Sequence, residues 1–587
     1  MPFPRNLASK LNLSPPPTAK APRRWPFWSA ALFIGLLQTW AHRHDFAPDG
    51  ISYMDIAWAT ARFGLAHLVN GYWSPLYPFL LSFEFRFFHP SPQMEFAAVH
   101  LLNFVLFVGT IASFELFLNE LILARRRASS MTAESAAGSE RTLRLWGSVL
   151  FVWATQFWLG PALITPDLCV ATLVFLATAL LLRIRRGLAS WPLFLIFGTL
   201  LGLAYLAKTV MFFVAFVFLT SAFFLGRKSG LPLRSAALRS LLAAGVFACF
   251  ALPFVHALSL QKGRLTIGDA GSINFAEYVN RATLWFHWQG EPSGTGVPSH
   301  ATRKVFSDPA IYEFASPVSG TYPPWYDPSY WYEGIHPSFS LRNQLWAMFR
   351  AANAYLRFFS KSGALWLAIA TLWFFWKKKF IGVSLAPGTW LAFLPSAAAL
   401  AMYELVHVEY RLVAPFALLL LLGALAKVGP KEADDPWHVR RLAVIIALAP
   451  MLAILWSAAR DVALLVRNAP DEQWEVAQQL YDFGVLPGSQ IATLGTGSAA
   501  AWAHLAGVRI IAEAPDKELP RFIVANAERK LQILGLLSSL GAAAIVTSNL
   551  PVANSSRGWR AIPRTHYFVW LPPDRKESGV PSPSTVP

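Results

Sequence analysis

Long apolar runs separated by short polar connections dominate the pattern of this chain. A bilayer core requires roughly 17–25 mostly apolar residues per helix, and most of the runs approach or reach that length. The pattern therefore predicts an all-α polytopic membrane bundle with about eleven transmembrane helices. The runs lie near 25–41, 97–122, 145–160, 168–182, 191–207, 209–225, 241–259, 362–376, 389–404, 412–426 and 442–458.

Two of the connections are much longer than the others. They cover 42–96 and 260–341, and both are rich in aromatic residues. Long loops in compact proteins are usually functional lids or are disordered. The aromatic content favours ordered loops that lie on the membrane surface, within a bundle that covers residues 25–459.

The pattern changes after residue 460, where short β-rich runs replace the long apolar segments. Strands are expected at 489–494, 508–512, 542–547 and 566–571, which predicts a small C-terminal soluble α/β domain over 460–574. Gly495-Thr496-Gly497-Ser498 follows the first strand and is similar to a dinucleotide-binding turn, but Ala500 replaces the third glycine. We therefore favour a structural role for this turn. The Ser/Pro-rich tail 575–587 is predicted to be disordered.

Composition and charge support the membrane assignment. Only 14% of the residues are charged and the mean hydropathy is +0.41, whereas soluble domains carry about 25% charged residues. The connections on one side of the predicted membrane, with the basic N-terminus 1–24, hold 24 Lys and Arg residues. On the opposite side, the connections 42–96, 159–167, 207–208 and 405–411 hold 5. This bias predicts a cytoplasmic N-terminus and an extracytoplasmic C-terminal domain. It also explains the net charge of +17 without nucleic acid as a partner.

Two further features bear on localisation. The segment 25–41 is interpreted as a membrane anchor, because no small-residue cleavage pattern follows it. The two cysteines, Cys169 and Cys249, give neither a disulfide framework nor metal-ligand spacing. No metal site is predicted. The sequence leaves room for a divalent cation but identifies no ligand set for one.

Ionisable residues gather at the predicted outer ends of the apolar segments. Such placements are costly in a membrane protein, which makes the residues functional candidates. The alternatives are helix caps and side chains that reach out to water. The predicted outer cluster consists of Asp49, Asp55, Asp167, Lys208, His407, Glu409, Tyr410 and Arg411.

The residue types suggest how such a cluster would work. Asp49 could act as a carboxylate base beside an aromatic shelf formed by Tyr53, Tyr72, Trp73 and Tyr77. A cation placed like Lys208 would meet a phosphate or a carboxylate. Two readings stay open elsewhere: Asp167 could cap its helix, and Arg411 could form a structural ion pair with Glu409.

These residues resemble motifs of the GT-C glycosyltransferases, in particular bacterial relatives of the protein O-mannosyltransferases and the lipid A aminoarabinose transferase. The resemblance covers roughly 25–425. It rests on an acid followed four residues later by Tyr53, and on the runs 74–78, 165–167, 202–208 and 409–411. One departure is Ser74, where the aminoarabinose transferases carry a lysine. A second is Gly50, where many members have another acid.

The resemblance implies transfer of a sugar from a polyprenyl-phosphate-linked donor to a glycan, lipid or protein acceptor, at the outer face of a bacterial inner membrane. It implies that Asp49, the general base, and Asp167 are the catalytic carboxylates, and that Lys208 meets the donor phosphate. Substrate-binding residues would be Tyr53, Asp55, Trp73, Tyr77, Lys208, His407, Glu409, Tyr410 and Arg411. Two alternatives remain at this point: a transporter or flippase of lipid-linked saccharides, and a non-catalytic membrane assembly factor.

Overall fold

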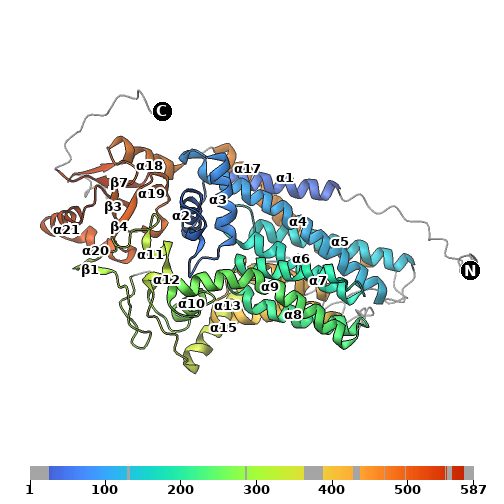
Figure 1. Ribbon diagram of the computed structural model, residues 1–587. Helices are drawn as coiled ribbons and strands as arrows, with labels where there is room; N and C mark the ends of the chain where they lie inside the picture. The colour runs from blue at the N-terminus through green and yellow to red at the C-terminus, as the bar shows by residue number, and fades with distance from the viewer. Residues whose placement is uncertain are drawn as a thin grey trace, which may run out of the picture.

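The computed structural model confirms a largely helical protein with a small sheet domain at one end (Figure 1). It describes residues 25–128, 133–284, 287–361, 388–427, 436–467, 470–495, 497–548, 550 and 558–573. The predicted basic N-terminus 1–24, the predicted span 362–376 and the predicted disordered tail 575–587 lie outside these ranges.

Ten of the eleven apolar segments fall on helices of the bundle. These helices are α1 (Trp25–Ala41), α4 (Glu95–Ala128), α5 (Ala133–Phe157), α6 (Asp167–Arg185), α7 (Trp191–Ala207), α8 (Met211–Lys228), α9 (Leu233–Lys262), α15 (Leu394–Val406), α16 (Tyr410–Leu425) and α17 (Pro436–Arg467). The amphipathic helix α13 (Leu341–Lys361) packs against α15. The long apolar helices make this an integral membrane protein.

Length and hydropathy single out fewer spans than the sequence predicted. Among the described residues, four helices are long and apolar enough to cross a membrane: α4, α6, α8 and α9. Helices α7, α15 and α16 are apolar but shorter. Because α15 has 13 residues, it extends only about 20 Å at 1.5 Å per residue. The total of eleven crossings therefore stays a prediction.

The predicted outer loop 42–96 is largely helical. It contains α2 (Pro48–Phe63), the 3-10 turn η1 (Leu65–Leu68) and α3 (Leu76–Phe88). The second long loop contains the short helices α10 (Ala270–Tyr278), α11 (Pro323–Tyr326) and α12 (Pro328–Trp331). Both loops lie at the end of the bundle that carries the sheet (Figure 1). We call this the sheet end.

A seven-stranded sheet has the order β1-β2-β4-β3-β5-β7-β6. Its strands are β1 (Arg303–Ser307), β2 (Ala310–Glu313), β3 (Gln490–Leu494), β4 (Arg509–Ala514), β5 (Ile545–Ser548), β6 (Trp559–Ala561) and β7 (Tyr567–Trp570). Central β3 pairs in parallel with β4 and β5, whereas the outer pairings are antiparallel. The helices of this domain are α18 (Glu472–Asp482), α19 (Ala501–Leu505), α20 (Leu519–Val524) and α21 (Ala527–Ser539).

The sheet corrects the predicted composition of the C-terminal domain. The four strands expected within 460–574 are present as β3, β4, β5 and β7. However, β1 and β2 come from the second long loop, and β2 pairs antiparallel with β4 through Tyr312 opposite Glu513. The sheet domain is therefore built from two distant parts of the chain, which ties the loop 260–341 to it.

Basic side chains gather at the opposite end of the bundle from the sheet. Helix α4 begins at Glu95, beside the sheet domain. Near its other end, Glu120 pairs with Arg183 of α6 and with Arg186, the residue that follows α6. Arg185 donates to the backbone carbonyl of Lys228 at the end of α8. The described Arg clusters and the sheet thus lie at opposite ends of the long helices.

The glycine-rich turn after β3 is explained by backbone geometry and packing. Gly495 has a φ of +105°, a region that favours glycine, and its N–H donates to the carbonyl of Ala514. A Cβ on Gly497 would lie 2.1 Å from Glu513 Oε2. Glu513 is buried and its Oε1 accepts from His287 and Tyr322 at 2.7 and 2.8 Å.

We expect Gly497→Ala to destabilise the sheet domain by about 1–3 kcal/mol, because the new methyl group would overpack the fixed carboxylate of Glu513. Chemical denaturation of the full chain measures the change in unfolding free energy. Hydrogen exchange of the sheet-domain amides shows whether the change lies in that domain. Gly535→Ala is the matched control, since a Cβ there meets nothing within 4 Å on helix α21. Equal stability of the two variants would contradict the packing role of Gly497.

Candidate functional site

A network of ion pairs at the sheet end joins five of the predicted residues. Arg411 lies at its centre: its guanidinium is 2.7 Å from Asp49 Oδ2, 2.8 Å from Glu409 Oε1 and 3.7 Å from Asp167 Oδ2. Lys208 Nζ donates to Asp167 Oδ1 at 2.7 Å. Residues that are 362 positions apart, such as Asp49 and Arg411, therefore share one charged site. We call these five residues the charged network.

Helix ends position the members of the network. Asp49 and Asp167 lie in the first turns of α2 and α6, whose N-cap residues are Ala47 and Pro166. Negative charge is favourable at a helix N-terminus and positive charge at a C-terminus. Lys208 fits the second case, because it is the C-cap residue of α7 in extended conformation. Asp167 Oδ1 accepts from Lys208, and its position in the first turn of α6 also suits the helix-end alternative.

The charged network has a buried end and an open end. The side chain of Asp167 is 5% exposed, whereas Lys208 is 24%, Asp49 and Arg411 are 21% and Glu409 is 43% exposed. Among the described residues, Asp167 Oδ2 is buried without a hydrogen-bond donor. Both cations and Asp49 are therefore partly accessible, whereas Asp167 is enclosed and its Oδ1 accepts from Lys208.

The predicted aromatic shelf is a buried cluster. The ring of Tyr53 lies 5.0 Å from that of Trp73 and 5.3 Å from that of Tyr77, and the three side chains are at most 6% exposed. Tyr77 donates to Asn103 Oδ1, and Trp73 Nε1 to the carbonyl of Trp325. The faces predicted to bind substrate are thus covered by neighbouring residues. We revise their role to fixing α2, which carries Asp49.

Asp55 is not held by the charged network. Its carboxylate accepts hydrogen bonds from the backbone N–H and the hydroxyl of Thr321, at 2.7 and 2.9 Å, and contacts Nδ1 of His504 at 2.7 Å. His504 Nε2 contacts Glu95 at 2.9 Å. Asp55 therefore joins α2 to the sheet domain, and we revise its predicted substrate-binding role to a structural one.

The contact around His504 should be sensitive to alkaline pH. Burial alone would lower the pKa of His504, but Glu95 and Asp55 together raise it to about 10 from 6.5. A raised pKa means that the charged imidazole contributes full stability below pH 6.5 and loses it as the pH rises toward 10. We expect His504→Gln to lower the melting temperature at pH 6.5, with a difference from the wild type that narrows toward pH 10. A constant difference would contradict this assignment.

Two other predicted residues flank Glu409. His407 stacks on Tyr278, with ring centroids 3.9 Å apart, and burial lowers the pKa of its imidazole. Tyr410 packs against Phe358 at 5.5 Å. Both side chains are half-buried, so they shape the wall beside the network. Their predicted contact with substrate stays a prediction.

Sequence reasoning did not identify His504 and Glu95 as partners of Asp55. A single histidine in an alanine-rich helix carries no local signal of a contact 449 residues away. Among the described residues, no group of three or more His, Cys, Asp or Glu is arranged to hold a metal ion. Lys208 and Arg411 instead occupy the space between the carboxylates of the charged network.

Comparison with known proteins identifies the fold. No protein-family model and no curated protein matches the sequence. The apo structure of ArnT from Cupriavidus metallidurans matches with a TM-score of 0.50 at 13% identity, over 93% of this chain and 97% of that one. The structure of the same ArnT bound to undecaprenyl phosphate matches with a TM-score of 0.49 at 14% identity, over 94% of this chain and 98% of that one. The oligosaccharyltransferase of Archaeoglobus fulgidus, in complex with zinc and sulfate, matches with a TM-score of 0.48 at 13% identity, over 89% of this chain and 68% of that one.

A similarity at 13% identity establishes the fold and leaves the substrates open. The fold shared with ArnT agrees with the membrane architecture that the resemblance of the sequence motifs implies. The similarity also extends beyond the predicted range 25–425, because it covers 93% of the chain. The chain has the fold of ArnT.

Proposed function

We propose that this protein is a membrane glycosyltransferase that transfers a sugar from a polyprenyl-phosphate donor to an acceptor outside the cytoplasm. The observation that carries the proposal is the charged network, in which two reachable cations and a reachable carboxylate meet at the sheet end of an ArnT-like fold. The N-terminus would be cytoplasmic, because the Arg clusters lie at the other end of the long helices. The membrane would be a bacterial inner membrane.

The reaction is a displacement at the anomeric carbon of the donor sugar. The acceptor hydroxyl oxygen forms the new bond to that carbon, the bond from carbon to the phosphate oxygen breaks, and the polyprenyl phosphate leaves with the bonding electrons. The acceptor proton passes to a base. Two tasks thus fall to the protein: holding negative charge on the leaving phosphate and accepting the proton.

Lys208 and Arg411 suit the first task. Without donor, their charges are balanced by three carboxylates, those of Asp49, Asp167 and Glu409. A donor phosphate would compete with these carboxylates for Arg411 and share Lys208 with Asp167. Preorganised positive groups next to developing negative charge lower the barrier of such a displacement.

Asp49 suits the second task. Its carboxylate is partly exposed, lies at the N-terminus of α2 and is held from one side by Arg411. When the phosphate draws Arg411 away, the carboxylate becomes a better proton acceptor next to the reacting centre. Asp167 is mostly buried and bonded to Lys208. It would therefore act by positioning Lys208.

Reconstitution tests the proposal. Vesicles that contain the purified full chain are supplied with polyprenyl-phosphate sugars labelled in the sugar, together with a cell-envelope extract as acceptor. A transferase places the label in a new glycosidic bond and releases polyprenyl phosphate. Movement of intact labelled donor across the bilayer would instead identify a flippase. If the labelled sugar is neither transferred nor moved, and the sheet domain is required for assembly of a partner complex, the protein would be an assembly factor.

A further inference from the structure

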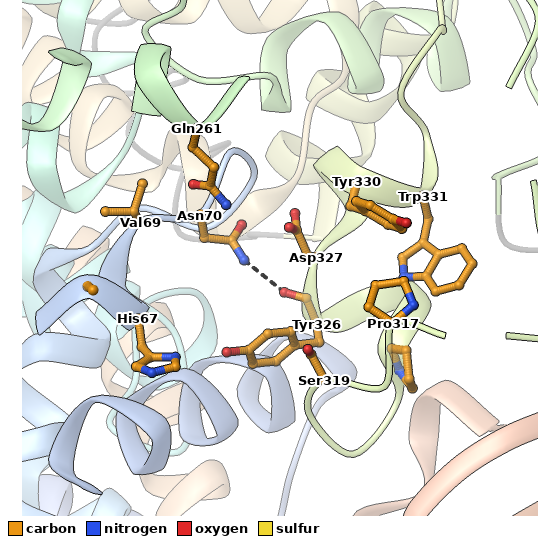
Figure 2. A pocket seen from close by; sticks show the side chains of 12 residues that line it. His67, Val69, Asn70, Gln261, Pro317, Ser319, Tyr326, Asp327, Tyr330 and Trp331 are labelled. Atoms are coloured by element: carbon orange, nitrogen blue, oxygen red, sulfur yellow. Dashed lines mark hydrogen bonds between the residues drawn. The ribbon is translucent and has the colours of Figure 1, made fainter. Parts of the chain in front are cut away.

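A small cavity lies at the sheet end, outside the charged network (Figure 2). It has a volume of about 220 Å³ and is lined by three segments: the residues after η1, the end of α9, and the stretch 317–331 of the second long loop. Figure 2 shows Asn70, Gln261 and Asp327 turned toward one another across this space, with the Tyr326 and Tyr330 rings beside them.

The cavity is built from fixed side chains. Asn70 Nδ2 donates to the carbonyl of Tyr326 at 2.9 Å, and Asn70 Oδ1 accepts from the backbone N–H groups of Tyr72 and Trp73. Ser329 donates to Asp327 Oδ1 at 2.5 Å. Burial raises the pKa of the Asp327 carboxyl group. The lining therefore presents a carboxyl group and amides in a preset arrangement.

The size and chemistry of the cavity exclude the lipid donor as its occupant. Sites for drug-sized ligands measure roughly 300–1,000 Å³, so about 220 Å³ suits a single small ring and not a polyprenyl chain. The carboxyl group of Asp327 is unsuited to a phosphate. The Asn70 amide oxygen already accepts from two backbone N–H groups and serves to fix the wall. Aromatic faces offer apolar contact, while the Gln261 amide and the Asp327 carboxyl group offer hydrogen bonds in a small volume. This combination matches a ring that carries several hydroxyl groups.

The cavity is connected to the helix that carries Asp49. Ser52, three residues after Asp49, donates to the carbonyl of Trp325 at 2.9 Å, and Trp73 Nε1 donates to the same carbonyl. Tyr326 follows Trp325 directly and lines the cavity. A ligand bound there is therefore placed relative to α2 and its catalytic carboxylate.

We propose that this cavity binds an uncharged saccharide unit of the acceptor, apart from the hydroxyl group that reacts. The inference rests on the proposed glycosyltransferase function and specifies its acceptor as a molecule that contains carbohydrate. A free monosaccharide would occupy the same cavity, because the recognising groups are the same.

Saturation-transfer NMR on the full chain tests the inference. The chain is placed in lipid nanodiscs without glycoside detergent, which would compete. The probes are methyl glycosides of glucose, mannose, galactose and N-acetylglucosamine, with tri-alanine and inorganic phosphate as other ligand classes. We expect at least one glycoside to bind, and Tyr326→Ala and Asp327→Asn each to raise its Kd by about tenfold, the effect of losing one good contact.

Matched controls come from the sheet domain. Tyr481 and Asp482 are exposed residues of the same types, so Tyr481→Ala and Asp482→Asn should leave the Kd unchanged. Asp49→Asn should also bind the glycoside normally, which separates this inference from the proposed reaction. Absence of glycoside binding, equal affinity in the cavity variants, or displacement of the glycoside by tri-alanine or phosphate would each overturn it.

Discussion

Asp49→Asn should reduce sugar transfer by about 10²–10⁴-fold, the usual contribution of a general base. The amide keeps the shape of the carboxylate but accepts a proton far less readily. Arg411 would retain Glu409 at 2.8 Å as a partner, so the fold should persist. Initial transfer rates at saturating donor, with the melting temperature of the same preparation, measure both effects.

A control variant distinguishes the loss of the catalytic base from the loss of any one negative charge. Asp482→Asn removes an exposed carboxylate from the sheet domain and should transfer at the wild-type rate. Donor affinity should not fall in Asp49→Asn, because Arg411 loses one of the carboxylates with which the donor phosphate competes. Near-normal transfer by Asp49→Asn would contradict the assignment of the base.

Lys208→Ala should have the second large effect, on both donor use and stability. Removing the ammonium group takes away the hydrogen bond to Oδ1 of Asp167, whose side chain is 5% exposed. The remaining cation, Arg411, lies 3.7 Å from Oδ2, which accepts no hydrogen bond among the described residues. An unsatisfied buried group of this kind costs about 1–3 kcal/mol. The KM for the donor should rise at least tenfold. Steady-state kinetics measures the KM, and the melting temperature of the same preparation measures the loss of stability.

A double variant separates the two roles of Lys208. In Lys208→Ala with Asp167→Asn the uncompensated charge is gone, so much of the lost stability should return. Donor use should not return, because the cation that meets the phosphate is still missing. Recovery of both properties would mean that Lys208 serves only to neutralise Asp167.

Much of the architecture could be predicted from the chain. Apolar runs place ten segments on helices, and the alternation after residue 460 predicts four of the strands. The charged network could also be predicted, because Asp49 lies in the outer loop 42–96 and the other four members lie at the ends of apolar segments, all on the same predicted side. Once the number and direction of the membrane-spanning helices are assigned, the helix ends on one side of the membrane lie at a similar depth.

The remaining features depend on contacts that no local pattern encodes. Strands β1 and β2 are short and pair with each other, and β2 joins them to β4 across some 200 residues of sequence. Tyr53, Trp73 and Tyr77 look suited to a sugar, yet their rings pack on one another. Residue type indicates which chemistry is available, whereas burial decides whether a side chain reaches a ligand.

A structure of the full chain with a bound polyprenyl-phosphate sugar is the most direct test. The phosphate oxygens should lie within about 3 Å of Lys208 Nζ and of the Arg411 guanidinium, with the anomeric carbon facing Asp49. A phosphate bound at the Arg183 and Arg186 end of the bundle, or away from both cations, would contradict the proposed role of the charged network.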